Sequence, residues 1–242
     1  MDKLAKLMQD IAILWDKYHP MYLRGMLSTL GLALAATAIG CIIGLACGIL
    51  NTIPCAKNDP WPKRILLKIL RVIIRIYVEV FRGTPMMLQA VFIFYALPYF
   101  TDNALRFDNI WAASILIVSI NTGAYMAEII RGGIMAVDEG QNEAGRSLGL
   151  NFAQTMLYII IPQALKNVLP ALANEFIVLL KETSVACYVA VNDLTKGGEI
   201  IRSQTYIQAM PLLIVAALYL IMVVFFSHLV SKLERRLRSS DH

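Results

Sequence analysis

Residues 26–50 read MLSTLGLALAATAIGCIIGLACGIL, a run of 25 residues without a charged side chain. An α-helix rises about 1.5 Å per residue, so about 20 apolar residues cross a hydrocarbon core of about 30 Å. Three further uncharged runs follow at 83–101, 109–127 and 206–231. Each run predicts one membrane crossing by a helix.

The composition agrees with an integral membrane protein. Of the 242 residues, 58% are apolar and 16% are charged, and the mean hydropathy is +0.62. A soluble domain carries about 25% charged residues. The net charge of +5 does not indicate nucleic-acid binding, because the basic residues adjoin the apolar runs and form no separate basic region.

The segment 168–192 is long enough for a fifth crossing but contains Glu175, Lys181 and Glu182. At the centre of a membrane helix each charge costs about 2.5–3.5 kcal/mol, whereas an apolar residue returns only about 0.3–0.6 kcal/mol. We therefore predict a helix whose charged face looks into a protein bundle or an aqueous cavity. The expected fold class is all-α, a polytopic membrane protein with five transmembrane helices.

The distribution of basic residues predicts the orientation. Residues 56–75 contain six basic residues and one acidic residue, and residues 232–242 contain four and two. The positive-inside rule places both in the cytoplasm. Residues 1–25 and 102–108 show no such excess and are expected outside. The N-terminus is thus predicted outside, the C-terminus inside, and the central loop 128–167 in the cytoplasm.

These patterns divide the chain into an external segment 1–25, a single membrane domain 26–231 and a basic cytoplasmic tail 232–242. The external segment fits an amphipathic helix on the outer surface or, equally well, a plain lead-in helix. Its apolar residues at helical spacing are Leu4, Leu7, Met8, Ile11 and Leu14. The first apolar run starts too late and is too long for a cleavable signal peptide.

Small residues recur every four positions in the first crossing, at Ala36, Gly40, Gly44 and Gly48. One face of that helix is therefore nearly bare backbone. Such a face lets a neighbouring helix approach closely, and we interpret it as a packing surface.

A charged stripe precedes the second crossing, formed by Arg71, Arg75, Glu79 and Arg82. Their spacing of four, four and three places them on one helical face, where Glu79 is positioned to pair with either neighbouring arginine. We interpret the stripe as a solvated or interfacial helix face.

The sequence contains no constellation for catalysis or metal binding. The cysteines at 41, 47, 55 and 187 lack CxxC or Cys/His spacing, and the three histidines stand apart. No nucleophile has a base at a suitable spacing, and no glycine loop for phosphate is present. The chain is expected not to be an enzyme and to bind no cofactor or metal.

The central loop predicts two short helices. Asp138 followed by Gln141, and Asn151 followed by Gln154, fit helix N-caps with a partner three residues on. Gly149 suits the C-terminal stop of the first helix. The loop is therefore expected to form a compact helical hairpin with a glycine elbow.

The same loop carries a recognisable motif. Residues 143–145 read Glu-Ala-Gly, Gly149 follows after three positions, and after nine more residues 159–162 read Ile-Ile-Ile-Pro. This resembles the EAA loop of permease subunits of binding-protein-dependent ATP-binding-cassette importers, whose pattern is Glu-Ala-Ala, three positions, Gly, nine positions, Ile-x-Leu-Pro. Gly145 and Ile161 depart from that pattern by small changes.

The resemblance extends from about residue 28 to 235. Residues 77–85 (YVEVFRGTP), 124–133 (AYMAEIIRGG) and 165–173 (LKNVLPALA) are similar to the polar amino acid branch of that family, which includes histidine, glutamine and arginine permeases.

This resemblance implies a type I importer permease in the bacterial cytoplasmic membrane. It implies a second permease copy, identical or a sister chain, two cytoplasmic ATPase subunits that hold ATP and Mg, and an external substrate-binding protein. It also implies that the hairpin couples to an ATPase subunit. The expected coupling residues are Glu143, Ala144, Gly145, Arg146, Ser147, Leu148 and Gly149.

Acidic residues in the fourth crossing along the chain, 168–192, predict the substrate site. Glu175 and Glu182 are seven residues apart and therefore share a helix face, which lines a central cavity in the permeases that this chain resembles. Buried acids in a membrane are functional candidates, and we expect these two to hold cationic groups of an amino acid. The alternative is that they pair with Lys181 or with arginines of neighbouring helices. Neutral hydrogen bonds are expected from Asn121, Tyr125, Asn174 and Thr183.

Many relatives carry Gln at the position of Glu175, so the extra charge favours a cationic amino acid over glutamine or another neutral polar one. A secondary transporter or channel is a rival interpretation, but it does not need the EAA spacing, and no internal repeat is found. A membrane enzyme would need a catalytic constellation, which the sequence lacks.

Overall fold

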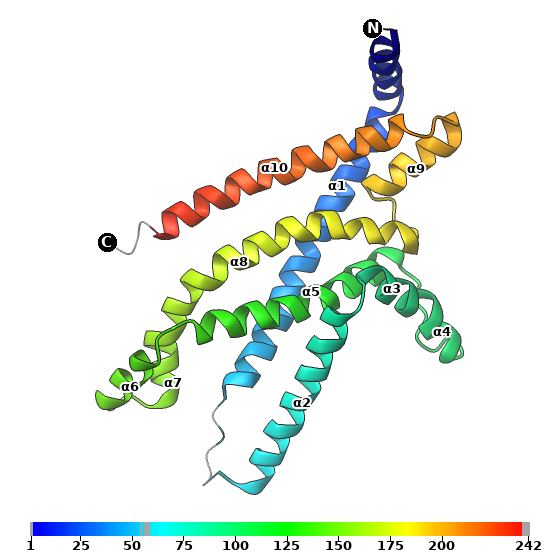
Figure 1. Ribbon diagram of the computed structural model, residues 1–242. Helices are drawn as coiled ribbons and strands as arrows, with labels where there is room; N and C mark the ends of the chain where they lie inside the picture. Colours follow the sequence, from blue (N-terminus) through cyan, green and yellow to red (C-terminus); the bar gives the residue numbers. More distant parts are fainter. Residues whose placement is uncertain (1, 54, 56–58, 239–242) are drawn as a thin grey trace. The chain divides into compact units, whose positions relative to one another are not determined.

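The structure is a computed structural model that describes residues 2–53, 55 and 59–238. Lys57 of the basic segment, the last four residues of the tail and the side chain of Leu4 lie outside this description. The described residues form helices joined by short connections, with no strand among them (Figure 1). The expected all-α class is confirmed.

The helices differ widely in length. In chain order they are α1 (Asp2–Thr52), α2 (Trp61–Gly83), α3 (Met86–Val91), α4 (Leu97–Phe100), α5 (Ile110–Met135), α6 (Glu139–Ser147), α7 (Phe152–Thr155), α8 (Ile161–Glu182), α9 (Leu194–Thr205) and α10 (Met210–Arg238). Two π-helical turns, Phe92–Ala96 and Met156–Ile160, and a 3₁₀ turn, Thr183–Val189, continue α3, α7 and α8.

Four helical segments of the described chain are long and apolar enough to cross a membrane. They are Leu7–Thr52, Ile110–Met135, Phe152–Val189 and Met210–Arg236. The third contains Glu175 and Glu182, as expected for a charged crossing, although it ends at Val189, short of the predicted residue 192.

The crossing predicted at 83–101 corresponds to a shorter apolar helix. Its apolar helix covers only Met86–Phe100, about 22 Å at 1.5 Å per residue, which is shorter than the hydrocarbon core. Gly83 ends α2 before it, and Pro85 separates the two helices. Five crossings are therefore not established by these helices.

Each π-helical turn ends two residues before a proline. The turn Phe92–Ala96 precedes Pro98, and the turn Met156–Ile160 precedes Pro162. Proline has no amide N–H to donate to the carbonyl four residues back, so the hydrogen-bond ladder changes register there without ending the helix.

The chain folds as two compact units, each assembled from three stretches. The first unit comprises Met1–Ala36, Pro85–Ser119 and Ile177–Ser227, and the second comprises Thr37–Thr84, Ile120–Phe176 and His228–His242. Four long helices, α1, α5, α8 and α10, contribute a part to each unit.

In the first unit, the N-terminal part of α1 packs on α9 and α10. Leu14 and Tyr22 of α1 are buried with Leu194 and Ile201 of α9, and with Ile214, Val215, Leu218 and Met222 of α10. Residues 2–25 belong to the same helix, α1, as residues 26–50, and Leu14 packs on protein. A second buried cluster joins α1, α3, α5 and the 3₁₀ turn through Leu32, Ala90, Ile117, Ala186, Val189 and Val191.

In the second unit, the glycine stripe of α1 lies against α5. A Cβ on Gly40 would lie 2.8 Å from Thr122 Cγ2, one on Gly44 would lie 2.5 Å from Met126 Cβ, and one on Gly48 would lie 2.8 Å from Ile130 Cγ2. Only glycine allows this approach, so the packing surface predicted from the small residues is confirmed at these three positions.

Gly44→Ala is expected to destabilise the protein. The added methyl would also meet backbone atoms, Met126 C at 2.8 Å and Ala127 N at 2.9 Å, so helices must shift. Overpacking of this kind costs about 1–3 kcal/mol, which exceeds the gain of up to about 1 kcal/mol in helix propensity. Thermal unfolding in detergent should show a midpoint lowered by about 2–4 °C for each kcal/mol lost.

Gly31→Ala in the same helix is the matched control. A Cβ at Gly31 has no atom within 4 Å, so this variant should unfold at the wild-type midpoint or above it. Equal midpoints for the two variants would contradict close packing of α1 on α5.

Candidate functional site

The central loop forms a helical hairpin of α6 and α7 with defined caps. Asp138 caps α6, since its Oδ1 accepts a hydrogen bond from the Gly140 amide at 2.7 Å. The expected partner role of Gln141 is wrong, because its Oε1 accepts from Gln163 Nε2 at 3.2 Å. The second predicted cap is confirmed: Asn151 and Gln154 exchange two side-chain to backbone hydrogen bonds of 2.9 Å, a complete capping box.

The elbow between these helices depends on Gly149. Its φ of +82° lies in the left-handed region that side chains disfavour. The Leu150 amide donates to Gly145 O at 3.1 Å and the Gly149 amide donates to Arg146 O at 3.0 Å. These two bonds form a Schellman motif, which satisfies the last carbonyls of α6 and confirms the predicted stop.

Gly145 lies on the buried side of α6, where it faces Thr155 and Ile159. It is buried, and a Cβ there would lie 2.7 Å from Thr155 Cγ2 and 3.0 Å from Ile159 Cδ1. Glycine in place of the motif's second alanine therefore lets α6 lie directly on the following helix.

The other predicted coupling residues are exposed on the outside of the hairpin. Leu148 exposes 79% of its surface, and four further coupling residues are also exposed: Glu143, Ala144, Arg146 and Ser147. The hairpin thus combines capped, internally packed helices with the strongly exposed apolar side chain of Leu148.

A polar cavity of about 520 Å³ lies in the second unit. It is lined by Asn51, Arg71, Ile74, Arg75, Val78, Glu79, Arg82, Glu128 and Arg131. Four arginines face two glutamates there, so its lining favours an anionic group. Glu128 and Arg131 were not among the predicted site residues, although their spacing of three residues within a helix was a usable signal.

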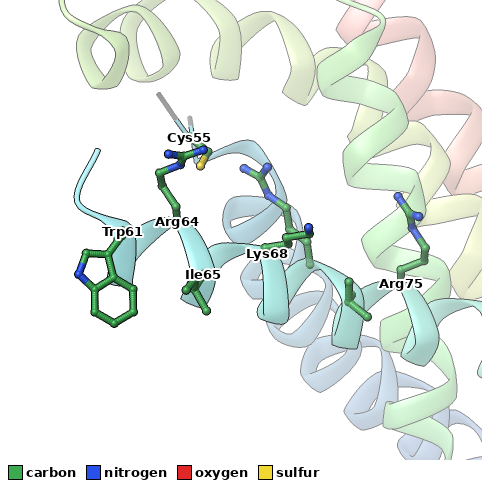
Figure 2. Close-up of a pocket in the computed structure, with 8 residues that line it drawn as sticks. Cys55, Trp61, Arg64, Ile65, Lys68 and Arg75 are labelled. Atoms are coloured by element: carbon green, nitrogen blue, oxygen red, sulfur yellow. The ribbon is translucent and has the colours of Figure 1, made fainter. Parts of the chain in front are cut away.

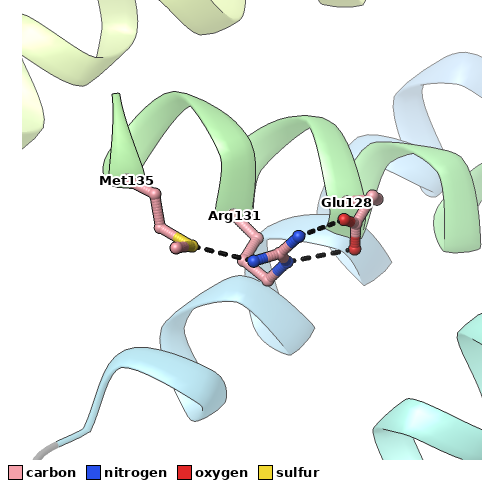
Figure 3. A network of polar contacts seen from close by, with 3 residues as sticks. All are labelled: Glu128, Arg131 and Met135. Atoms are coloured by element: carbon pink, nitrogen blue, oxygen red, sulfur yellow. Dashed lines mark hydrogen bonds and ion pairs between the residues drawn. The ribbon is translucent and has the colours of Figure 1, made fainter. Parts of the chain in front are cut away.

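An ion pair on α5 fixes one wall of this cavity (Figure 3). Arg131 Nε donates to Glu128 Oε2 at 3.1 Å, its Nη2 donates to Glu128 Oε1, and its Nη1 contacts Met135 Sδ at 2.8 Å. Arg82 lies over the ring of Tyr125 with its guanidinium carbon 5.4 Å from the ring centroid. No ion pair joins Glu79 to Arg75 or Arg82 in the described part of the chain.

Four predicted substrate residues belong to the second unit. Asn121 is 2% exposed, and its Nδ2 donates to Phe81 O at 3.2 Å, which ties α5 to α2. Tyr125 contacts Arg82 as described. On α8, Asn174 is exposed and donates to Glu234 Oε1 at 3.2 Å, while Glu175 is half-buried.

The other two predicted substrate residues belong to the first unit. Thr183 is fully buried, and its hydroxyl donates to Leu180 O at 3.0 Å. Glu182 is the last residue of α8, and its side chain is exposed. Within the described residues no group of three or more His, Cys, Asp or Glu is placed to hold a metal ion.

Asp193 is a buried acid that was not among the predicted site residues. It is 0% exposed and caps α9, because its Oδ1 accepts a hydrogen bond from the Lys196 amide at 2.8 Å. The adjoining Leu194 amide donates to Thr29 Oγ1 at 3.2 Å, which fixes the same turn to α1. Burial raises the pKa of Asp193 to about 6, and the hydrogen bond from Lys196 only partly opposes the shift.

Comparison with known proteins assigns the family. The family model for the "binding-protein-dependent transport system inner membrane component" matches residues 64–239. The chain therefore belongs to this family. This permease is 35% identical over 229 residues to the "glutamine transport system permease protein GlnP" of Escherichia coli (strain K12), covering 95% of the chain and 98% of that protein.

Two further relatives match the permease over most of its length. The "arginine transport system permease protein ArtQ" of Bacillus subtilis (strain 168) is 32% identical over 222 residues, covering 92% of the chain and 94% of that protein. A crystal structure of "an amino acid ABC transporter with histidines" matches with 41% identity and a TM-score of 0.81, covering 93% of the chain and 97% of that one. The expected type I permease fold is confirmed.

Asp193→Asn is expected to change how the stability of the permease depends on pH. The pKa of Asp193 is higher in the folded protein (about 6) than the ordinary 3.8, so the folded state binds more protons between these values. The contribution of Asp193 to the free energy of unfolding is therefore fully present below about pH 4 and is lost as the pH rises through 6. Asparagine keeps the cap but does not titrate.

Thermal unfolding of both proteins in detergent from pH 5 to 7.5 tests this. The variant should gain stability relative to the wild type as the pH rises, by at most about 3 kcal/mol. A difference that stays constant with pH would show that Asp193 is not buried as a titrating acid.

Proposed function

We propose that this chain is the membrane-spanning subunit of an ATP-driven importer of polar amino acids, with a preference for cationic ones. The relatives named for glutamine and arginine transport, and the solved amino acid transporter with histidines, support the substrate class. The observation that carries the coupling role is the rigid α6–α7 hairpin with its exposed Leu148.

The hairpin acts as a lever between a cytoplasmic ATPase subunit and the membrane helices. A lever transmits motion only if it does not bend, and the capped helices, the Schellman motif and the close contact at Gly145 supply that stiffness. The outward Leu148 provides an apolar anchor, the kind of side chain that fills a pocket on a partner.

ATP and Mg are held by the partner subunits in this proposal, and the chain itself hydrolyses nothing. The full importer contains a second permease, identical or a sister chain, two ATPase subunits and an external binding protein. The N-terminus lies outside and the C-terminus inside, as the basic residues of α2 and of the tail favour.

Glu175 and Glu182 of α8 are the proposed partners of the substrate's cationic groups. Tyr125 and Asn174 have partly or fully exposed side chains that suit neutral contacts. Asn121 and Thr183 remain in the proposed set, but each is buried, so a substrate contact by either requires its present hydrogen bond to break.

A neutral substrate is the second candidate, because the relative named for glutamine transport is 35% identical. The charge at position 175 distinguishes the two. A carboxylate stabilises an ammonium or guanidinium side chain, whereas it offers a neutral amide only a hydrogen bond.

Uptake by proteoliposomes that contain the permease, its ATPase subunits and a loaded binding protein tests the function. Accumulation should require ATP and the ATPase subunits. In this assay Gly149→Val should lower uptake at least about tenfold, because a β-branched residue at φ +82° costs about 1–3 kcal/mol and distorts the elbow.

Gly149→Asn is the control, since asparagine tolerates the left-handed region and no atom lies within 4 Å of the added Cβ. It should retain most of the uptake. Equal losses in both variants, or accumulation driven by an ion gradient without the ATPase subunits, would contradict the proposed coupling.

Glu175→Gln tests the substrate preference. The change removes one negative charge with little change in volume, so uptake of arginine, lysine or histidine should fall by about tenfold while glutamine uptake stays within about twofold. Competition assays with the same proteoliposomes measure both. Unchanged uptake of the cationic amino acids would refute the preference for cationic substrates, and the assignment as an importer would still stand.

A further inference from the structure

A groove of about 640 Å³ runs along the first half of α2, outside the sites described above except for two shared arginines. It is lined by Cys55, Trp61, Arg64, Ile65, Lys68, Arg71, Val72 and Arg75. All these residues belong to the second unit. Figure 2 shows Arg64, Lys68 and Arg75 directed to one side of the helix, with Trp61 and Ile65 on the other.

The residues that line this groove include four basic residues and no acidic one. Arg64, Lys68, Arg71 and Arg75 are spaced four, three and four residues apart, which places them on one helical stripe. No described carboxylate pairs with any of them, and Arg71 donates to the Ile53 carbonyl. Four positive charges therefore line a groove whose described lining contains no negative charge, and this lining favours an anionic occupant.

The opposite wall is apolar and exposed. Trp61, Ile65 and Val72 expose 72%, 49% and 48% of their surfaces. Further round the helix the exposed face continues with Leu66, Ile69, Ile73, Ile76 and Val80. A helix with one basic and one broad apolar face, bearing a tryptophan near its start, has the character of a segment at the membrane interface.

From these two walls we infer that the groove binds an anionic phospholipid. The phosphate lies among Arg64, Lys68, Arg71 and Arg75, and an acyl chain follows Trp61, Ile65 and Val72. Arginine and lysine side chains are the usual hydrogen-bond donors to phosphate in proteins. A free phosphate ion has no use for the continuous apolar wall. This inference holds whichever amino acid the permease carries.

Lys68→Gln and Lys63→Gln form a matched pair for the test. The two lysines are exposed, lie five residues apart on α2, and differ in that Lys68 lines the groove while Lys63 pairs with Asp59 at 3.0 Å. The full-length chain is placed in phosphatidylcholine nanodiscs, and binding of phosphatidylglycerol is measured by native mass spectrometry. Lys68→Gln should weaken binding about fivefold and Arg64→Gln/Lys68→Gln about twentyfold or more, whereas Lys63→Gln should stay within twofold.

Two further measurements distinguish a phospholipid from a free phosphate ion. Inorganic phosphate at millimolar concentration should not displace the lipid, and Trp61→Ala should weaken binding of long-chain phosphatidylglycerol more than that of a short-chain form. Equal binding of phosphatidylcholine and phosphatidylglycerol, displacement by phosphate alone, or an equal loss in Lys63→Gln would overturn the inference. Weaker co-purification of ATPase subunits with Lys68→Gln, at unchanged lipid binding, would overturn it in favour of a protein interface.

Discussion

The close contact between α1 and α5 is the interaction on which the second unit depends. Helices in lipid gain little from burying apolar surface against each other, so their association depends on van der Waals contact between closely approaching backbones. Gly40, Gly44 and Gly48 permit that approach. On the same α5, Gly123 leaves room for Ile43 and Tyr77, and the Tyr77 hydroxyl donates to Ile120 O at 2.5 Å.

This junction determines where the charges of α2 are placed. The hydrogen bonds from Tyr77 to Ile120 and from Asn121 to Phe81 attach one face of α2 to α5. The basic stripe of α2, formed by Arg64, Lys68, Arg71 and Arg75, lies to one side of this packed face. The stripe then borders both the cavity that contains Glu128 and Arg131 and the groove that ends at Trp61. Charges on a membrane protein are tolerated where protein, water or lipid headgroups can solvate them, and both places meet that requirement.

Much of the architecture was predictable because membrane helices must satisfy their own backbone and bury no charge in lipid. The run at 26–50 lies within the apolar helix Leu7–Thr52, and most of the runs at 109–127 and 206–231 lies within Ile110–Met135 and Met210–Arg236. The hairpin was also predictable, since Asn151, Gln154 and Gly149 act through local hydrogen bonds and backbone angles. The run 83–101 is apolar and helical only over Met86–Phe100, because Pro85 separates this helix from α2.

The sequence by itself determined the membrane class, the glycine face of α1, the elbow at Gly149 and the family, because each depends on residues close together in the chain. Tertiary structure alone decided that Thr183 and Asn121 are buried with their hydrogen bonds engaged, that Gln141 bonds Gln163, and that Asp193 is a buried acid. It also decided that no described carboxylate pairs with the groove arginines and Lys68. These features depend on which distant segments pack together, and spacing along one helix carries no information about that.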